Sequence, residues 1–229
     1  GMGVLVFLLS LLPLAGGYHM NLMKAESPGP SVSKLVPKVQ STAKILYTIY
    51  FGMTLIQLAL LLIGRVPLFD SLCITFGTAG TGGFGIVNDS LGSYSTYCQV
   101  VTTIFMILFG VNFSAYYLIL TKKFRQAFKY EEVRYYFGII AVAIVIIALN
   151  TAHLFRNLLT AFQQAAFQVG SIITTTGFSS TDFNQWPALS KTVLVLLMFV
   201  GACAGSTGGG LKVSRILILC KAAKKEFQL

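Results

Sequence analysis

Long apolar runs alternate with short polar segments along the whole chain. Several runs reach the roughly 20 residues that a helix needs to cross a bilayer, whereas two are too short to do so. At 1.5 Å per residue the shortest covers about 16 Å, roughly half of the bilayer core. The pattern predicts spanning helices at Ala43–Gly64, Tyr94–Leu120, Tyr135–Phe155 and Ala188–Cys220, and short helices at Val66–Phe76 and Leu158–Ile173. As one helix Tyr94–Leu120 would be about 40 Å long, so it must tilt or extend past the core.

The predicted helices follow the same order twice, which indicates an internal repeat in one orientation with a period of about 94 residues. Each copy has a spanning helix, a short helix, a loop and a second spanning helix. The expected fold is an all-α membrane protein of tandem helix–pore-helix–loop–helix units, similar to those of potassium channels. The expected divisions are the end of an earlier helix (1–17), a linker (18–42), a pore repeat (43–120), a second linker (121–134), the next pore repeat (135–220) and a tail (221–229).

A loop rich in threonine and glycine follows each short helix. The first Thr/Gly segment (residues 76–85) reads Phe-Gly-Thr-Ala-Gly-Thr-Gly-Gly-Phe-Gly, and the second (residues 170–182) reads Gly-Ser-Ile-Ile-Thr-Thr-Thr-Gly-Phe-Ser-Ser-Thr-Asp. Placing Gly83 on Gly177 also places Thr81 on Thr175. Two such loops, each after a helix too short to span, indicate re-entrant pore loops; plain extracellular turns are the alternative.

The last apolar run contains an interruption, the glycine-rich segment (residues 201–210), Gly-Ala-Cys-Ala-Gly-Ser-Thr-Gly-Gly-Gly. Each glycine costs roughly 1 kcal/mol in a helix interior, so a continuous helix is not expected. Backbone that is not helical at membrane depth has to be satisfied by protein or by water. The matching position in the earlier repeat, residues 110–112, is much poorer in glycine. We therefore expect a flexible insert in the later repeat only.

Composition and charge place the chain in a membrane. Apolar residues make up 55% of the chain and charged residues only 10%, against roughly 25% charged residues in soluble domains. The net charge of +10 does not indicate nucleic-acid binding, because the basic residues gather in the linkers and the tail while the intervening loops are balanced. This alternation is the positive-inside pattern. The basic segments are therefore expected in the cytoplasm, with the Thr/Gly segments open to the other side.

The Thr/Gly segments have the chemistry of a cation pathway. A cation that crosses a bilayer needs oxygens in place of water, and glycine lets backbone carbonyls turn inward to supply them. Asp89 follows the first segment and Asp182 ends the second, and both are candidates for an outer mouth that concentrates cations. The candidate selectivity-filter residues are Thr81, Gly82, Gly83, Thr174, Thr175, Thr176 and Gly177.

Further candidates lie along the path below these loops. Asn112 either lines the pore or forms a hydrogen bond between helices. A charge in mid-bilayer costs at least about 2.5–3.5 kcal/mol, so Lys212 and Arg215 face a cavity or snorkel to the cytoplasmic interface. The candidate gate residues are Gly205, Ser206, Thr207, Gly208, Gly209, Gly210, Lys212 and Arg215.

No residue pattern indicates an enzyme, a cofactor or a structural metal. The sequence contains no nucleophile–base pair, phosphate loop or dinucleotide motif, and His19 and His153 lack acidic or cysteine companions at ligand spacing. Three functions remain open. They are uptake of potassium through the loops, secondary transport of another cation or solute at broken-helix sites, and a membrane scaffold without transport.

Several stretches resemble the Trk/Ktr/HKT superfamily of potassium transporters, specifically its TrkH type. Residues 201–215, which run from the glycine-rich segment to Arg215, closely resemble a signature of that family. Residues 166–178 with Trp186-Pro187 are similar to its third pore loop, residues 76–84 to its second, and residues 25–30 to the linker after its first repeat. The resemblance covers essentially the whole chain.

The resemblance implies a four-repeat pore of which this chain supplies only a part. The chain would contain the end of the first repeat and all of the second and third. Gly83 and Gly177 would be filter glycines that favour potassium, the transported substrate, and residues 201–210 would form an intramembrane gate beneath the filter. Members of the family are dimers in the bacterial inner membrane, in contact with lipid and with cytosolic nucleotide-binding regulatory subunits of the TrkA type.

Overall fold

A computed structural model describes residues 39–123, 125–126 and 130–226, with side chains from residue 44 onward. These residues form helices, turns and loops without a strand, so the predicted all-α class is confirmed. The predicted helix end at residues 1–17, most of the 18–42 linker and the last residues of the tail lie outside the described residues.

The earlier repeat forms four helices. The long α3 (Val39–Ile63) precedes the short α4 (Leu68–Ala79), and after the first Thr/Gly segment the chain continues as α5 (Thr96–Phe109) and α6 (Phe113–Leu120). Pro67 stands just before α4, where its fixed φ suits a helix start. At its other end, α4 continues to Ala79, three residues past the predicted end at Phe76 and inside the first Thr/Gly segment.

The bend between α5 and α6 corrects the sequence-based expectation of one tilted span at Tyr94–Leu120. The two helices meet at 93°. Gly110 ends α5, and Asn112 begins α6 by accepting a hydrogen bond from the Ser114 N–H through its side-chain oxygen (2.9 Å). The break was expected in the later repeat alone, but both repeats are interrupted at this position.

The later repeat follows the same order with a longer interruption. Its long helix α8 (Glu131–Thr151) continues into the 3-10 turn η1 (Ala152–Leu154) and is followed by the short α9 (Leu158–Ile173), whose bounds match the prediction. After the second Thr/Gly segment and η2 (Phe183–Gln185) come α10 (Ala188–Val200) and α11 (Val213–Glu226). The predicted break at the glycine-rich segment is confirmed, since residues 201–212 are not helical.

Two helices of the described residues are long and apolar enough to cross a membrane. They are Lys44–Ile63 in α3 and Glu131–Leu154 in α8 with η1. The bent pair α5 and α6 becomes a third if it counts as one broken span, whereas α4, α9 and α10 are shorter apolar helices. The lengths of the helices therefore alternate between long and short, as the sequence predicts.

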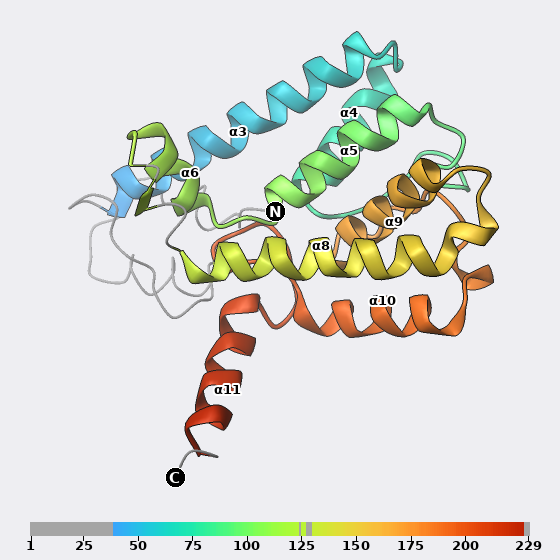
Figure 1. Ribbon diagram of the computed structural model, residues 1–229. Coiled ribbons are helices and arrows are strands. Elements are labelled where there is room, and N and C mark those ends of the chain that lie inside the picture. The colour runs from blue at the N-terminus through green and yellow to red at the C-terminus, as the bar shows by residue number, and fades with distance from the viewer. Residues whose placement is uncertain (1–38, 124, 127–129, 227–229) are drawn as a thin grey trace.

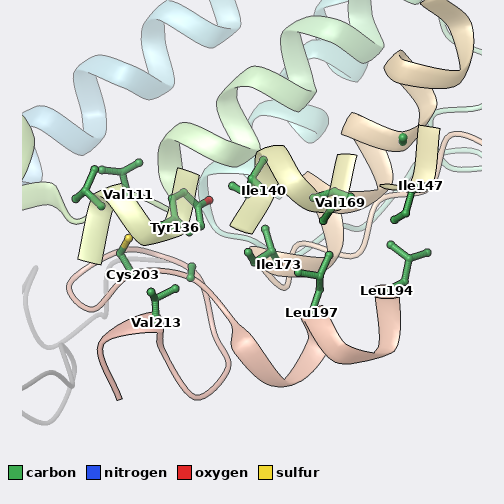
Figure 2. Close-up of a cluster of buried hydrophobic side chains, with 14 of the residues drawn as sticks. Val111, Tyr136, Ile140, Ile147, Val169, Ile173, Leu194, Leu197, Cys203 and Val213 are labelled. Carbon is green, nitrogen blue, oxygen red and sulfur yellow. The ribbon is translucent and has the colours of Figure 1, made fainter. Parts of the chain in front are cut away.

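The two repeats pack through α9, and the core consists of two clusters of buried apolar side chains, each with residues from both repeats. Helix α9 contacts α5 as well as α8, and Figure 1 shows α10 beside α8 while α11 points away from the other helices. One buried cluster joins α3, α4 and α5, and it includes Phe178 from the second Thr/Gly segment. The other joins α8, α9 and α10 with the start of α11 (Figure 2).

Candidate pore loops and the glycine-rich segment

The two Thr/Gly segments have the same backbone conformation at the positions that the sequence alignment pairs. Thr81 and Thr175 have positive φ angles of 52° and 58°, and Gly83 and Gly177 have 65° and 91°. Threonine is unfavourable in this left-handed region because its Cβ crowds the backbone. The same strained residue in both loops indicates that surrounding contacts hold each loop in this shape.

Equivalent hydrogen bonds close the two segments onto the ends of their short helices. In each, three successive amides donate to carbonyl oxygens of the last helical turns, and the donors and acceptors of one set lie 94 positions after those of the other. The first set is Thr81 N–H to Thr78 O (3.1 Å), and Gly82 and Gly83 N–H to Gly77 O (2.8 and 3.3 Å). The second set is Thr175 N–H to Ile172 O (3.0 Å), and Thr176 and Gly177 N–H to Ser171 O (2.9 and 3.4 Å).

The segments also contact each other directly. A Cβ atom placed on Gly83 would lie 1.9 Å from the carbonyl oxygen of Thr176, so glycine is required for this approach. The ring of Phe178 packs on Gly77 so closely that a Cβ there would lie 2.8 Å from the ring. In the stretches that follow Gly83 and Gly177, the Leu91 N–H donates to the Ser179 carbonyl (2.8 Å).

The glycine-rich segment lies against both Thr/Gly segments. The hydroxyl of Thr81 donates to the Thr207 carbonyl (2.9 Å), and the Gly209 N–H donates to the Thr175 hydroxyl (2.7 Å). The two positive-φ threonines are therefore the contact points for the segment. The structure thus brings the candidate filter and the candidate gate together.

The same segment fills the bend between α5 and α6. The Cys203 N–H donates to the Gly110 carbonyl (3.0 Å), and both the N–H and the hydroxyl of Thr207 donate to the Phe109 carbonyl (3.2 and 3.1 Å). In return, the Phe113 N–H donates to the Gly205 carbonyl (3.0 Å). The backbone groups released by the bend are therefore satisfied by this segment.

The two candidate gate cations differ in their surroundings. Lys212 is only 6% exposed, and its ammonium donates to the Gly208 carbonyl. Arg215 is exposed on the first turns of α11. Only Lys212 is therefore brought into the glycine-rich segment.

The candidate outer-mouth carboxylates are exposed, as a site open to solvent requires. Asp89 accepts a hydrogen bond from Ser93. Asp182 accepts from the Asn184 N–H (3.0 Å) and from the Gln185 side chain (3.2 Å), and these bonds hold its pKa below the usual value. Asn112 is partly buried and caps α6, so the structure gives it a helix-capping role, and its predicted place in a pore lining stays a prediction.

Sequence reasoning missed Glu132, which lies on the first turn of α8. Its Oε1 atom accepts hydrogen bonds from the Ala204 N–H (2.6 Å) and the Ser214 N–H (3.2 Å), on either side of the glycine run. An acidic residue at a helix start ordinarily indicates only an interaction with the helix dipole. The sequence signal that could have identified Glu132 is that acidic residues are rare in this chain, which contains only 7 of them.

Long apolar helices, two matched Thr/Gly segments that each follow a short helix, and a glycine-rich segment between α10 and α11 define an integral membrane protein with two matched helical repeats. The family model for TrkH, described as a cation transport protein, matches residues 1–229, and the chain belongs to this family. The resemblance noted in the sequence is therefore confirmed. Members of this family are transporters and not enzymes, as the sequence analysis expects.

Named relatives and a solved structure extend this result. The chain is 34% identical to the Trk system potassium uptake protein TrkH of Salmonella typhimurium, over 100% of this chain and 48% of the relative. It is 30% identical to TrkG of Escherichia coli, over 99% and 47%. The crystal structure of the potassium transporter TrkH from Vibrio parahaemolyticus superposes with a TM-score of 0.82 at 29% identity, covering 99% of this chain and 47% of that one. The chain spans about half the length of these relatives.

Proposed function

We propose that the chain forms part of a potassium-uptake pore in which the two Thr/Gly segments contribute a selectivity filter. The observation that carries this proposal is the direct contact of the two matched segments at Gly83 and Thr176. Carbonyl oxygens of such loops replace the hydration shell of a cation. The filter residues are Thr81, Gly82, Gly83, Thr174, Thr175, Thr176 and Gly177.

The pore repeats, residues 43–120 and 135–220, form an arc that further repeats complete. Phe178 is 1% exposed because it packs on the short helix of the earlier repeat, but its counterpart Phe84 is 82% exposed. A Cβ on Gly83 would meet the later repeat, but a Cβ on Gly177 would have no atom within 4 Å in the described residues. A preceding repeat would receive Phe84, and a following repeat would approach Gly177.

The glycine-rich segment acts as the gate of this pore. Its hydrogen bonds to Thr81 and Thr175 support this role, because they place it against both filter segments. Its glycines allow it to change conformation at low steric cost. Lys212 belongs to the gate, Arg215 flanks it, and Asn112 lies beside it at the bend of the earlier repeat.

The setting of the proposed pore follows from the family and from charge. The protein lies in the bacterial inner membrane with its basic linkers in the cytoplasm. Asp89 and Asp182 attract cations to the opposite mouth. The complete protein is a dimer that binds cytosolic nucleotide-binding subunits of the TrkA type.

Growth of uptake-deficient bacteria at low potassium tests the proposal. The chain is expressed alone and as a form extended to four repeats, and membrane fractions establish that both reach the membrane. We expect the extended form to restore growth, and restoration by the chain alone would mean that copies assemble to close the ring.

A failure of both membrane-inserted forms to restore growth would contradict potassium uptake. Uptake of another solute, unaffected by potassium, would then favour the second candidate, a secondary transporter whose sites lie at broken helices. The interruptions at residues 110–112 and 201–212 are the observation that favours this alternative.

A further inference from the structure

The carboxylate of Glu132, at the start of α8, contacts the backbone on both sides of the glycines of the glycine-rich segment. One of its oxygens accepts from the Ala204 N–H before the run and from the Ser214 N–H after it. Ala204 and Ser214 are both buried. The intervening residues contain Gly205, Gly208, Gly209 and Gly210 and have little helix or strand structure to fix them.

These two amides depend on Glu132 for different reasons. The Ser214 N–H belongs to the first turn of α11, where amides have no partner within the helix and the dipole favours a negative charge. The Ala204 N–H lies in a loop without regular structure. Hydrogen bonds to an ionised acceptor are stronger than neutral ones, and a buried amide that loses its partner is costly.

The neighbouring Cys203 shows how closely the segment is held. Its side chain is completely buried. Figure 2 shows Cys203 and Val213, which flank the run, pointing toward Tyr136 on α8. The Val213 N–H donates to the Ala202 carbonyl (3.1 Å), so the two ends of the loop lie side by side beneath α8. Glu132 is on the same helix, one turn from Tyr136.

We propose that Glu132 is a positioning residue that clamps the two ends of the glycine-rich segment and so holds it against the Thr/Gly segments. The proposal rests on the gating role proposed above for its effect on transport. The clamp belongs to the later repeat, because the position 94 residues before Glu132 is Lys38, which has no acceptor to offer. Loss of the clamp would release the segment from beneath the pore loops.

The test measures labelling of Cys203 by a membrane-impermeant thiol reagent applied from the cytoplasmic side. The complete transporter is prepared with Cys203 as its only cysteine, and in parallel with Cys98, which is completely buried in the earlier repeat. Each form carries Glu132→Ala, Glu132→Gln or Glu131→Gln. Glu131 is the matched control, because it is the adjacent residue and forms an exposed ion pair with Lys221.

We expect Glu132→Ala to accelerate Cys203 labelling at least about tenfold, which corresponds to about 1.4 kcal/mol, and to raise potassium flux. Glu132→Gln keeps an acceptor oxygen without its charge and should give a smaller acceleration. Cys98 labelling and the Glu131→Gln variant should match the parent. Equal acceleration at Cys98 would mean general loosening and would overturn the clamp.

Two outcomes separate this proposal from the proposed function. A transporter that takes up potassium but labels Cys203 at the parent rate in both Glu132 variants would refute the clamp and leave the pore standing. Selective Cys203 labelling in a protein without potassium flux would retain the clamp and refute the pore. If Glu132→Ala does not fold, Glu132→Gln decides, because unchanged labelling in that variant also refutes the clamp.

Discussion

Replacing Gly83 by alanine puts one methyl group into the contact between the two pore-loop segments. The new Cβ would lie 1.9 Å from the Thr176 carbonyl oxygen and 2.8 Å from its carbon. Both atoms belong to the backbone, so no side-chain rotation relieves the overlap. A second cost comes from the φ angle of +65° at Gly83, because an L-residue in the left-handed region costs roughly 1–2 kcal/mol.

This overlap forces the backbone around Gly83 and Thr176 to move apart. The distance must grow from 1.9 Å to at least 3.0 Å, a displacement of 1.1 Å or more, since shorter Cβ contacts essentially do not occur. If the Thr176 carbonyl moves, it leaves the position in which it would replace the water of a bound cation. We therefore expect Gly83→Ala to lower potassium flux and to reduce the preference for potassium over sodium. A lower amount of folded transporter would reduce the flux of both ions equally.

The assay is potassium and sodium uptake by the complete transporter in proteoliposomes, with Gly82→Ala as the matched control. Gly82 lies in the same segment, but its Cβ would meet only the exposed ring of Phe84 at 3.2 Å, and it has no positive φ. Because Gly82 is itself a proposed filter residue but its new Cβ would displace only a side chain, we expect Gly82→Ala to lose much less selectivity than Gly83→Ala. Gly83→Ala with parental flux and selectivity would refute the assignment of the filter to this contact.

Three further variants test other parts of the site. Thr175→Val removes the acceptor of the Gly209 N–H, an exposed hydrogen bond worth about 0.5–1.5 kcal/mol. Uptake should therefore rise if the glycine-rich segment closes the pore, and unchanged uptake would contradict this. Asp182→Asn should reduce uptake at low potassium by the same factor at every pH above the ordinary aspartate pKa. The reason is that hydrogen bonds lower the pKa of Asp182, so the parent protein loses this charge only below that range. A defect that shrinks near pH 5 would argue against a role for the Asp182 charge. Phe178→Ala removes a fully buried ring and should cost about 3–5 kcal/mol, seen as a lower midpoint of thermal unfolding in detergent, whereas Phe199→Ala, an exposed position on α10, should not.

The sequence predicted the parts of the fold that depend on local chemistry. The bounds of α9 and the break at residues 201–210 follow from apolar run length and glycine content. The sequence also predicted the pairing of the two loops. Aligning Gly83 with Gly177, the glycine that both loops share, also places Thr81 on Thr175. The backbone angles agree with this pairing.

The parts that the sequence did not predict depend on distant contacts. The bend at Gly110 has one glycine and a capping asparagine, too little for a prediction by propensity alone. It is held by the Thr207 side chain, which donates to the Phe109 carbonyl 98 positions away. Helix α4 also continues through Gly77, and the ring of Phe178, about 100 positions away, packs there. Glu132 acts on amides more than 70 positions away, and no local pattern contains them.

These distant contacts link gating to selectivity. The glycine-rich segment reaches the pore loops through Thr81 and Thr175, the two threonines with positive φ. If this segment is the gate, its departure removes an acceptor from Thr81 and a donor from Thr175, and so removes contacts that hold both strained residues in place. The open pore would then have a filter geometry different from that of the closed one. Gate variants should therefore change the potassium-to-sodium ratio as well as the flux, which an independent gate would leave unchanged.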